Sequence, residues 1–415
     1  MARSPFLHPF AKPASEDFIT IVRGDGSLVF DDHGHRYVDA LASLWYCNVG
    51  HARPEIADAV STQMRTLENY NTFDIFTNEP AEQAAAAISA LSPVPDARVF
   101  FTSSGSEAVD TALKLARMTF TRLGHPERHV LVGRQHAYHG VNYGGVSVQG
   151  LPLNKEGWGP LLDHTAQIDH EDLASAEKLF AERGHEIAAV IAEPVIGAGG
   201  VYPATAEYLR GLRKLCDESG ALLIFDEVIS GFGRLGSWFA AEYYGVTPDL
   251  ITFAKAVTSG YQPLGGVIVG PRVRAALEAA PDFLLRHGYT YSGHPAACVA
   301  ALANIAILRD EHLLERVPHI GARLGDGLRG LADDGLVADV RGEGAIWAMV
   351  MPDGVSALDV RNAMLADGVI ARPIGTAAVA FCPPLVISDD EIDECLAASR
   401  SALIAARAGA AGIQG

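Results

Sequence analysis

The chain has 415 residues, of which 49% are apolar and 20% charged, and its formal net charge is −18. This profile is typical of a globular enzyme with a large buried core, and it excludes a disordered chain. The acidic excess opposes binding to nucleic acid and to an anionic membrane surface.

The N-terminal residues 1–14 lack the apolar run of a signal peptide, and no later stretch approaches the length of a membrane span. The five cysteines are odd in number, lie far apart and form no C-x-x-C pair. Neither a disulfide framework nor a structural zinc site is therefore predicted. We expect a cytoplasmic protein without a membrane partner.

Between residues 99 and 269, short apolar runs alternate with amphipathic helical patterns. The runs are Val99–Thr102, Val130–Val132, Ala188–Ala192, Leu222–Phe225, Leu250–Phe253 and Val267–Val269. Such alternation predicts a parallel sheet with crossover helices. Before the fourth run, Thr205 is placed to cap a helix and Gly220 to end it.

After residue 295 the rhythm changes to the long Ala/Leu helix Ala296–Leu308, a second helical stretch, and short strands within Val337–Val350 and Val369–Phe381. This change predicts two domains. A large α/β domain would span residues 46–295, and a smaller α+β domain would be formed by both termini, residues 1–45 and 296–415.

A first candidate site lies where the strand ending at Thr102 turns through Ser103, Ser104 and Gly105 into a helix. A helix N-terminus offers unpaired N–H groups and a positive dipole end to an anion such as phosphate. Taken alone, the turn fits a plain helix cap equally well. It needs partners to indicate a binding site.

Two charged residues supply such partners, because each follows a strand that is apolar enough to be buried. Asp226 follows Leu222–Phe225, and a protonated pyridine nitrogen would satisfy its carboxylate. The alternative is that Asp226 caps a loop or pairs with Arg234. Lys255 follows Leu250–Phe253, where an ammonium is costly unless it snorkels, pairs, or forms a Schiff base. Phosphate site, aspartate and lysine match three needs of one cofactor.

From Asp39 to Glu394 the sequence resembles the class III aminotransferases. The matching words are Ser43-Leu44-Trp45, Ser104-Gly105-Ser106-Glu107-Ala108, Tyr138-His139-Gly140, Glu193-Pro194, Asp226-Glu227-Val228, Gly231-Phe232-Gly233-Arg234, Ala254-Lys255 and Thr290-Tyr291-Ser292-Gly293-His294-Pro295. The resemblance implies an α/β fold of type I, in which a large domain with a mainly parallel sheet sandwiched by helices joins the smaller α+β domain. It also implies pyridoxal 5′-phosphate as cofactor.

By this resemblance, Gly105 and Ser106 hold the cofactor phosphate. Tyr138 stacks on one face of the pyridine ring and Val228 covers the other face. His139 is expected among the cofactor contacts as well.

The same resemblance gives Asp226 and Lys255 the catalytic roles: Asp226 pairs with the pyridine nitrogen and Lys255 forms the Schiff base. Thr290 is expected to reach the phosphate of the neighbouring subunit, which implies a homodimer with shared active sites. Glu193 is either a cofactor contact or a structural residue.

The substrate class follows from smaller likenesses. Class III members that act on ornithine or 4-aminobutyrate commonly carry glutamine where this chain has Ile229. Trp45, Tyr138 and Arg372 resemble the β-alanine/amine–pyruvate group and are expected to line the substrate pocket. Arg372 is expected on a Pro/Gly-flanked loop, where its side chain turns inward to clamp a carboxylate and outward to leave an apolar pocket. The alternative is that Arg372 is a solvated surface arginine or pairs with Asp367.

We therefore expect an ω-aminotransferase that moves an amino group, by a ping-pong mechanism, from an amine or ω-amino acid to a keto acid, pyruvate above all. Diaminopelargonate, putrescine and taurine aminotransferases stay open, as does a decarboxylating or mutase relative.

A rival from another class is an NAD-dependent oxidoreductase, because residues 231–236 satisfy G-x-G-x-x-G. Four residues separate the preceding strand from the first glycine and no helical pattern opens at the third, which disfavours this reading. The histidine pairs have no matching ligand cluster, so no metal is expected. A non-enzymatic scaffold is a poor match to a lysine and an aspartate at strand ends.

Overall fold

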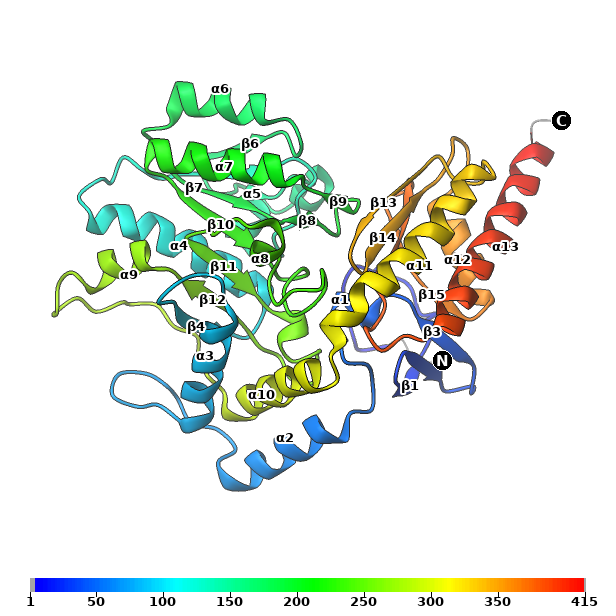
Figure 1. Cartoon of the computed structure of the whole chain (residues 1–415), viewed down its shortest axis with the longest axis horizontal. Helices are drawn as coiled ribbons and strands as arrows, with labels where there is room; N and C mark the ends of the chain where they lie inside the picture. Colours follow the sequence, from blue (N-terminus) through cyan, green and yellow to red (C-terminus); the bar gives the residue numbers. More distant parts are fainter. Residues whose placement is uncertain (1–3, 414–415) are drawn as a thin grey trace.

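A computed structural model describes residues 4–413, and its larger lobe is built on a seven-stranded sheet (Figure 1). From edge to edge the strands are β4 (Arg98–Thr102), β12 (Gly265–Val269), β11 (Leu250–Phe253), β10 (Leu222–Asp226), β7 (Ile187–Ala192), β5 (Val130–Arg134) and β6 (Thr165–Ile168). β12 runs antiparallel to both neighbours, and the other strands are parallel to one another. The mainly parallel sheet is confirmed.

Helices cover both faces of this sheet. Alternate residues of β10 point to opposite faces and every one is buried: Leu222 and Ile224 pack in the layer of α4 (Gly105–Arg122) and α9 (Pro271–Glu278). Leu223 and Phe225 pack in the layer of α6 (Leu173–Arg183) and α7 (Ala206–Ser219). Burial on both faces explains why the run that forms β10 is continuously apolar.

The ends of α7 follow from two residues. Thr205 Oγ1 accepts a hydrogen bond from Tyr208 N at 3.1 Å, which satisfies one of the unpaired N–H groups of the first turn. Gly220 adopts a left-handed conformation with φ 78°, which glycine tolerates without cost, and β10 begins two residues later. Both end signals predicted for this helix are confirmed.

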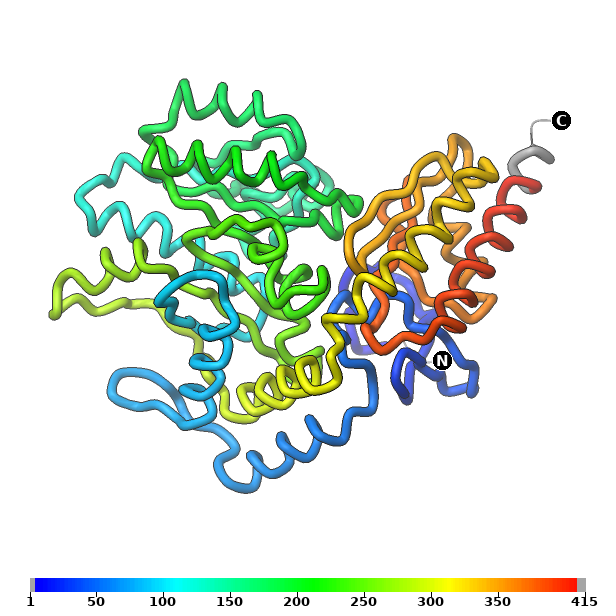
Figure 2. Tube along the Cα trace, in the orientation of Figure 1, coloured from blue at the N-terminus to red at the C-terminus, as the bar shows by residue number. Residues whose placement is uncertain are grey.

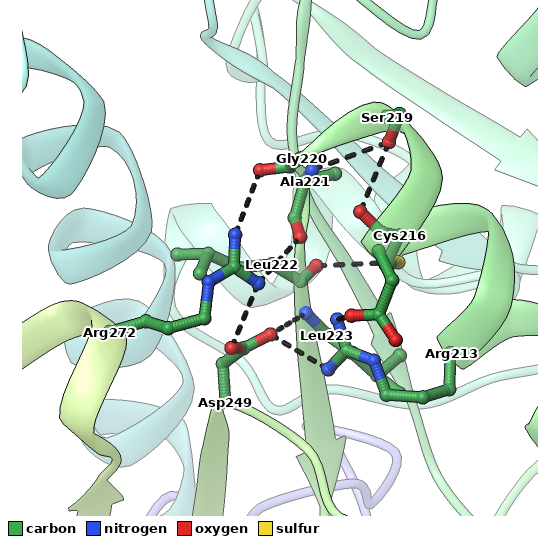
Figure 3. Close-up of polar contacts among 10 residues, drawn as sticks. Arg213, Cys216, Ser219, Gly220, Ala221, Leu222, Leu223, Asp249 and Arg272 are labelled. Carbon is green, nitrogen blue, oxygen red and sulfur yellow. Dashed lines mark hydrogen bonds and ion pairs between the residues drawn. The ribbon is translucent and has the colours of Figure 1, made fainter.

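The amino ends of β10 and β11 are fastened by the buried carboxylate of Asp249 (Figure 3). Oδ2 accepts from Leu223 N and from Arg213 Nη1, each at 2.8 Å, while Oδ1 accepts from Arg272 Nη1 at 3.0 Å. These bonds fix the register of β10 and β11 at their amino ends. The same register decides which residues lie side by side at their carboxyl ends.

The smaller lobe is formed by residues from both termini (Figure 2). One sheet has the order β1 (Ile21–Asp25), β2 (Leu28–Asp31), β3 (Arg36–Asp39) and β15 (Val369–Ile370), so it joins the N-terminal segment to the C-terminal part of the chain. A second, antiparallel sheet has the order β13 (Asp339–Glu343), β14 (Ile346–Val350), β17 (Ala378–Phe381) and β16 (Arg372–Ile374). The helices are α11 (Leu313–Asp333), α12 (Ala357–Ala366) and α13 (Asp389–Ile413).

Three helices lie at the base of the larger lobe, where α10 (Pro295–Asp310) packs on α2 (Pro54–Thr66) and α3 (Glu79–Leu91). The remaining elements are α1 (Ala42–Trp45), α5 (Tyr143–Val148), α8 (Ala240–Tyr244), β8 (Val195–Ile196), β9 (Tyr202–Pro203) and the 3₁₀ turns Pro152–Lys155 and Lys255–Val257. We propose that residues 1–45 and the chain after residue 295 form the smaller domain, with α10 as the exception, because it packs on α2 and α3 of the larger lobe. No helix within residues 4–413 is long and apolar enough to cross a membrane.

Candidate active site

Asp226 is the last residue of β10, and its buried carboxylate is held by three donors. Oδ1 accepts from Thr252 Oγ1 at 2.9 Å and from Val228 N at 3.2 Å, and Oδ2 accepts from His139 Nδ1 at 2.7 Å. These bonds fix the carboxylate at the carboxyl edge of the sheet, where ligands of open α/β sheets bind.

Arg234, the alternative partner of Asp226, lies elsewhere. Its buried guanidinium donates to Pro383 O at 2.5 Å and to Asn48 Oδ1, and so ties the larger lobe to the smaller one. Residues 231–236 form turns and bends and open no helix. The alternative pairing of Asp226 is wrong, and the glycine pattern lacks the structural context of a dinucleotide site.

Thr252 is a site residue that sequence reasoning missed. Its Cα is the register partner of Asp226 in the neighbouring parallel strand β11, so the two side chains meet across the strands. The signal was a hydroxyl residue inside the apolar run Leu250–Phe253, since a buried hydroxyl requires a hydrogen-bond partner.

The His139 ring is completely buried, and its bond to Asp226 fixes its tautomer. Because a carboxylate only accepts, Nδ1 carries the hydrogen and Nε2 is left as an acceptor. Within the described residues this buried Nε2 has no hydrogen-bond partner. A buried polar atom without a partner is consistent with a bound group that completes the site.

The N-terminus of α4 has free N–H groups that can bind an anion. Ser104 Oγ accepts from Glu107 N at 3.2 Å, and Glu107 Oε2 accepts from Ser103 N at 2.7 Å, which caps the helix. The N–H groups of Gly105 and Ser106, at the first two helical positions, have no acceptor inside the helix. They are the donors that the sequence predicts for a phosphate.

Close packing around this turn depends on two glycines. A Cβ at Gly105 would lie 2.9 Å from Val228 Cγ1, and one at Gly140, whose φ is +89°, would lie 2.4 Å from Ser106 Oγ. Ser106 Oγ accepts from Val141 N at 3.0 Å, so its hydroxyl hydrogen remains available for an acceptor. The turn, Val228 and the segment after Tyr138 therefore line one small region, which fits a ring that carries a phosphate.

Glu193 fixes the segment that carries Tyr138. Oε1 accepts from Tyr138 N at 2.8 Å and Oε2 from Gly197 N at 3.1 Å. Burial raises the pKa of Glu193, and the nearby His139 opposes this rise. These contacts are those of a residue that orients its neighbours.

Lys255 begins a 3₁₀ turn just beyond β11, with a left-handed φ of +49° that is unusual for a lysine. Burial lowers the pKa of Lys255, while the negative charges of Asp226 and Glu193 act against this shift. A lysine with a lowered pKa is more often the neutral amine, which is the form that acts as nucleophile and base. Backbone strain of this kind is common at functional sites.

Arg372 is partly buried, and burial lowers its pKa, an effect that the neighbouring Tyr138 opposes and Arg361 reinforces. Within residues 4–413 its guanidinium forms no ion pair, with Asp367 or with any other carboxylate. The predicted loop position is wrong: Arg372 opens β16 and is in register with Ala380 of β17. Its main chain is held in a sheet, so any swing belongs to the side chain.

Two further predicted residues are Trp45 and Thr290. Trp45 is only 2% exposed and ends α1, a turn in which Ala42, Ser43 and Trp45 all have positive φ. Thr290 is exposed in a turn after the sheet. Neither forms a hydrogen bond with the other predicted site residues in the described structure.

Comparison with known proteins gives one consistent picture. A family model described as Aminotransferase class-III matches residues 10–403. Putrescine–pyruvate aminotransferase of Pseudomonas aeruginosa is 37% identical, covering 97% of this chain and 95% of that protein; β-alanine–pyruvate aminotransferase of the same species is 40% identical over 79% and 78%. The amine transaminase of an uncultivated Pseudomonas species, solved in the PLP-bound (internal aldimine) form, superposes with a TM-score of 0.94 at 33% identity, covering 98% of this chain and 99% of that one.

Proposed function

This chain belongs to the class III aminotransferases and uses pyridoxal phosphate, and on this premise we propose that it transfers an amino group between an amine or ω-amino acid and pyruvate. The observation that carries the choice of acceptor is that the two relatives compared above, at 37% and 40% identity, are both named as pyruvate enzymes. The choice of a keto acid as acceptor is also supported by Arg372, whose guanidinium has no carboxylate partner among the described residues and so can bind the carboxylate of the acceptor.

When bound, the cofactor supplies an aldehyde that carries the amino group and a pyridine ring that withdraws electrons from the reacting carbon. Asp226 would face the pyridine nitrogen, and its negative charge would favour the protonated ring. Thr252 and His139 hold the Asp226 carboxylate in place, at 2.9 and 2.7 Å. Tyr138 and Val228 would enclose the two faces of the ring.

The cofactor phosphate would bind at the first turn of α4, through the N–H groups of Gly105 and Ser106 and the Ser106 hydroxyl. Lys255 would hold the cofactor aldehyde. As a neutral amine beside the bound substrate, Lys255 would move a proton at the reacting substrate carbon. Its lowered pKa favours this role, because a neutral amine accepts a proton.

The substrate pocket must accept an amine donor and then an acceptor with a carboxylate. Arg372 turns its side chain toward Tyr138 to bind the carboxylate and away from it for an apolar donor. Trp45 forms a wall on the side of the smaller lobe.

We further propose a homodimer in which Thr290 contacts the phosphate bound in the other subunit. The surface around Thr290 supports this arrangement, because large apolar side chains are exposed there: Phe73 47%, Ile75 82% and Tyr291 66%. Thr72 Oγ1 donates to Ser292 O at 2.9 Å, so these two segments lie together. Such a patch is typical of an interface. Light scattering of the purified holoenzyme should give twice the mass of the 44.0 kDa chain.

A panel of donors tests the proposed reaction. Five compounds are each assayed as amine donor with pyruvate and with 2-oxoglutarate as acceptor: β-alanine, putrescine, taurine, diaminopelargonate and a simple arylalkylamine. We expect the pyruvate reactions to be faster with at least one ω-amine. Faster turnover with 2-oxoglutarate across the panel would contradict the proposed acceptor while leaving the family assignment intact.

A further inference from the structure

The loop that carries Thr290 is bonded to helix α4 through the ring of His287. Lys114 Nζ lies 3.0 Å from Nδ1 of this ring, and Thr111 Oγ1 lies 2.9 Å from Nε2. The ring also stacks on Phe100 of β4, with centroids 5.2 Å apart and planes inclined by 4°. Two polar contacts and one stacking contact therefore fix the orientation of His287.

The hydrogen positions in this cluster follow from its chemistry. The Lys114 ammonium only donates, so Nδ1 of His287 must accept and Nε2 must carry the hydrogen. The hydroxyl hydrogen of Thr111 goes to the Tyr289 hydroxyl at 3.3 Å, so Thr111 Oγ1 accepts from Nε2. Lys114 and Thr111 thus require the same tautomer of the ring.

The chain of bonds ends at the phosphate turn. The Tyr289 hydroxyl donates to the main-chain oxygen of Glu107 at 3.2 Å, in the first turn of α4. On the other side of Thr290, Ser292 Oγ donates to Phe101 O at 2.7 Å and accepts from Tyr289 N at 3.2 Å. Thr290 therefore lies between Tyr289, which is bonded to the first turn of α4, and Ser292, which is bonded to the end of β4.

We propose that His287 is a positioning residue for Thr290: through Thr111 and Tyr289 it holds the loop in the conformation in which Thr290 meets the phosphate bound in the neighbouring subunit. This inference rests on the proposed function, which gives Thr290 its phosphate contact. His287 itself touches neither cofactor nor substrate.

The charges around His287 decide how the cluster responds to pH. Lys114 of α4 is the cation in contact, and the other charged residues of the surrounding cleft, about 450 Å³ in volume, are Arg122, Asp282 and Arg286. Glu107 and Asp110 of α4 lie near Tyr289. Burial and Lys114 both lower the pKa of His287 below its ordinary value of 6.5.

Because the pKa of His287 is lowered, the loop with these hydrogen bonds intact is more stable when the imidazole ring is neutral. The stabilising contribution is complete above about pH 6.5, the ordinary histidine value, and is lost as the pH falls toward the lowered pKa. Protonation places an N–H donor against the Lys114 ammonium, which breaks the first bond of the chain. The loop should then hold Thr290 less firmly.

The test measures how fast holoenzyme dimers release pyridoxal phosphate after dilution into cofactor-free buffer, followed by absorbance of the bound cofactor. Thr290→Ala should release it on the order of 10-fold faster, as expected for a lost bond to a charged group. His287→Phe keeps the stacking on Phe100 but removes both ring nitrogens, and should release roughly 3- to 10-fold faster. The double variant should release no faster than Thr290→Ala, because His287 acts through Thr290.

A second pair of variants separates positioning from mere support of the fold. His287→Gln keeps one acceptor and one donor without a titratable ring, so its release rate should match the wild type at pH 8 and stay flat on acidification, whereas wild-type release accelerates below about pH 6.5. His185→Gln, at an exposed and remote histidine, should keep the wild-type profile. If His287→Phe does not fold, Lys114→Met removes the outer donor and should show the same non-additivity with Thr290→Ala.

Wild-type release from His287→Phe together with fast release from Thr290→Ala would overturn the role of His287 and leave the proposed function standing. Additive effects in the double variant would overturn it as well. Wild-type release from Thr290→Ala would instead remove the phosphate contact of Thr290 from the proposed function, and this inference with it.

Discussion

Asp226 and Thr252 face each other across neighbouring parallel strands, and the Thr252 hydroxyl donates to Asp226 Oδ1 at 2.9 Å. The position of the Asp226 carboxylate, which we propose faces the cofactor, is therefore set by strand register and by a buried hydroxyl. Removing the Thr252 hydroxyl therefore tests, with a small change, whether this bond positions the Asp226 carboxylate.

Thr252→Val keeps the shape of the side chain and removes the donor. Loss of one hydrogen bond of about 0.5–1.5 kcal/mol should lower kcat roughly 2- to 13-fold with little change in thermal stability. The matched control is Thr119→Val, another buried threonine whose hydroxyl bonds only its own helix, at Leu115 O. Equal kcat values for the two variants would show that Thr252 does not support Asp226.

Asp226→Asn removes the negative charge while keeping the size of the side chain. The protonated pyridine ring loses its partner, so kcat should fall at least ~100-fold, the scale of deleting one preorganised electrostatic contact. Cofactor affinity should change far less, because the phosphate turn and Lys255 are untouched. Titration with pyridoxal phosphate and steady-state kinetics measure the two effects, and near-normal turnover would make Asp226 a structural residue.

The same substitution at the other end of the neighbouring strand is the natural comparison. Asp249→Asn breaks the buried contacts to Arg213 and Arg272. Unfolding free energy should drop by about 3 kcal/mol, the lower part of the range for removing one partner of a buried ion pair, since Arg272 is partly in water. Urea denaturation measures the loss. The folded fraction should keep its kcat, and a catalytic defect as large as that of Asp226→Asn would contradict the purely structural role.

Arg372→Ala tests how the carboxylate of the acceptor is bound. A charge-assisted contact is worth about 1.5–3 kcal/mol, so the KM for pyruvate should rise on the order of 10- to 150-fold. An uncharged aldehyde acceptor and an arylalkylamine donor should be spared. The control is Arg361→Ala, at the neighbouring arginine of α12. Equal losses with pyruvate and with the aldehyde would mean that Arg372 supports β16 and does not bind the carboxylate.

Much of the frame of the site was predictable, because strand burial leaves a strong mark on sequence. The continuous apolar runs before Asp226 and Lys255 indicated two buried strands, and a parallel sheet brings the ends of such strands to one edge. The direction of β12 was not predictable, since an apolar run is the same in either orientation. β6 was missed because its residues Thr165–Ile168 are few and mixed in polarity.

Contacts that depend on how distant segments align in the fold could not be predicted from the sequence. The bond from His139 to Asp226 joins residues 87 positions apart, and no local pattern specifies it. Arg372 was misplaced on a loop because Pro373 and Gly375 are typical of turns. The structure explains the error: β16 is an edge strand, and an edge strand tolerates proline, since its outward N–H has no partner to lose.

The central claim is that Lys255 holds the cofactor. Purified protein should be yellow, and borohydride treatment should attach the cofactor permanently to one lysine. Peptide mapping of the reduced protein measures which lysine that is. We predict a single labelled peptide that contains Lys255; a label on another lysine, or none on a protein that binds pyridoxal phosphate, would contradict the account.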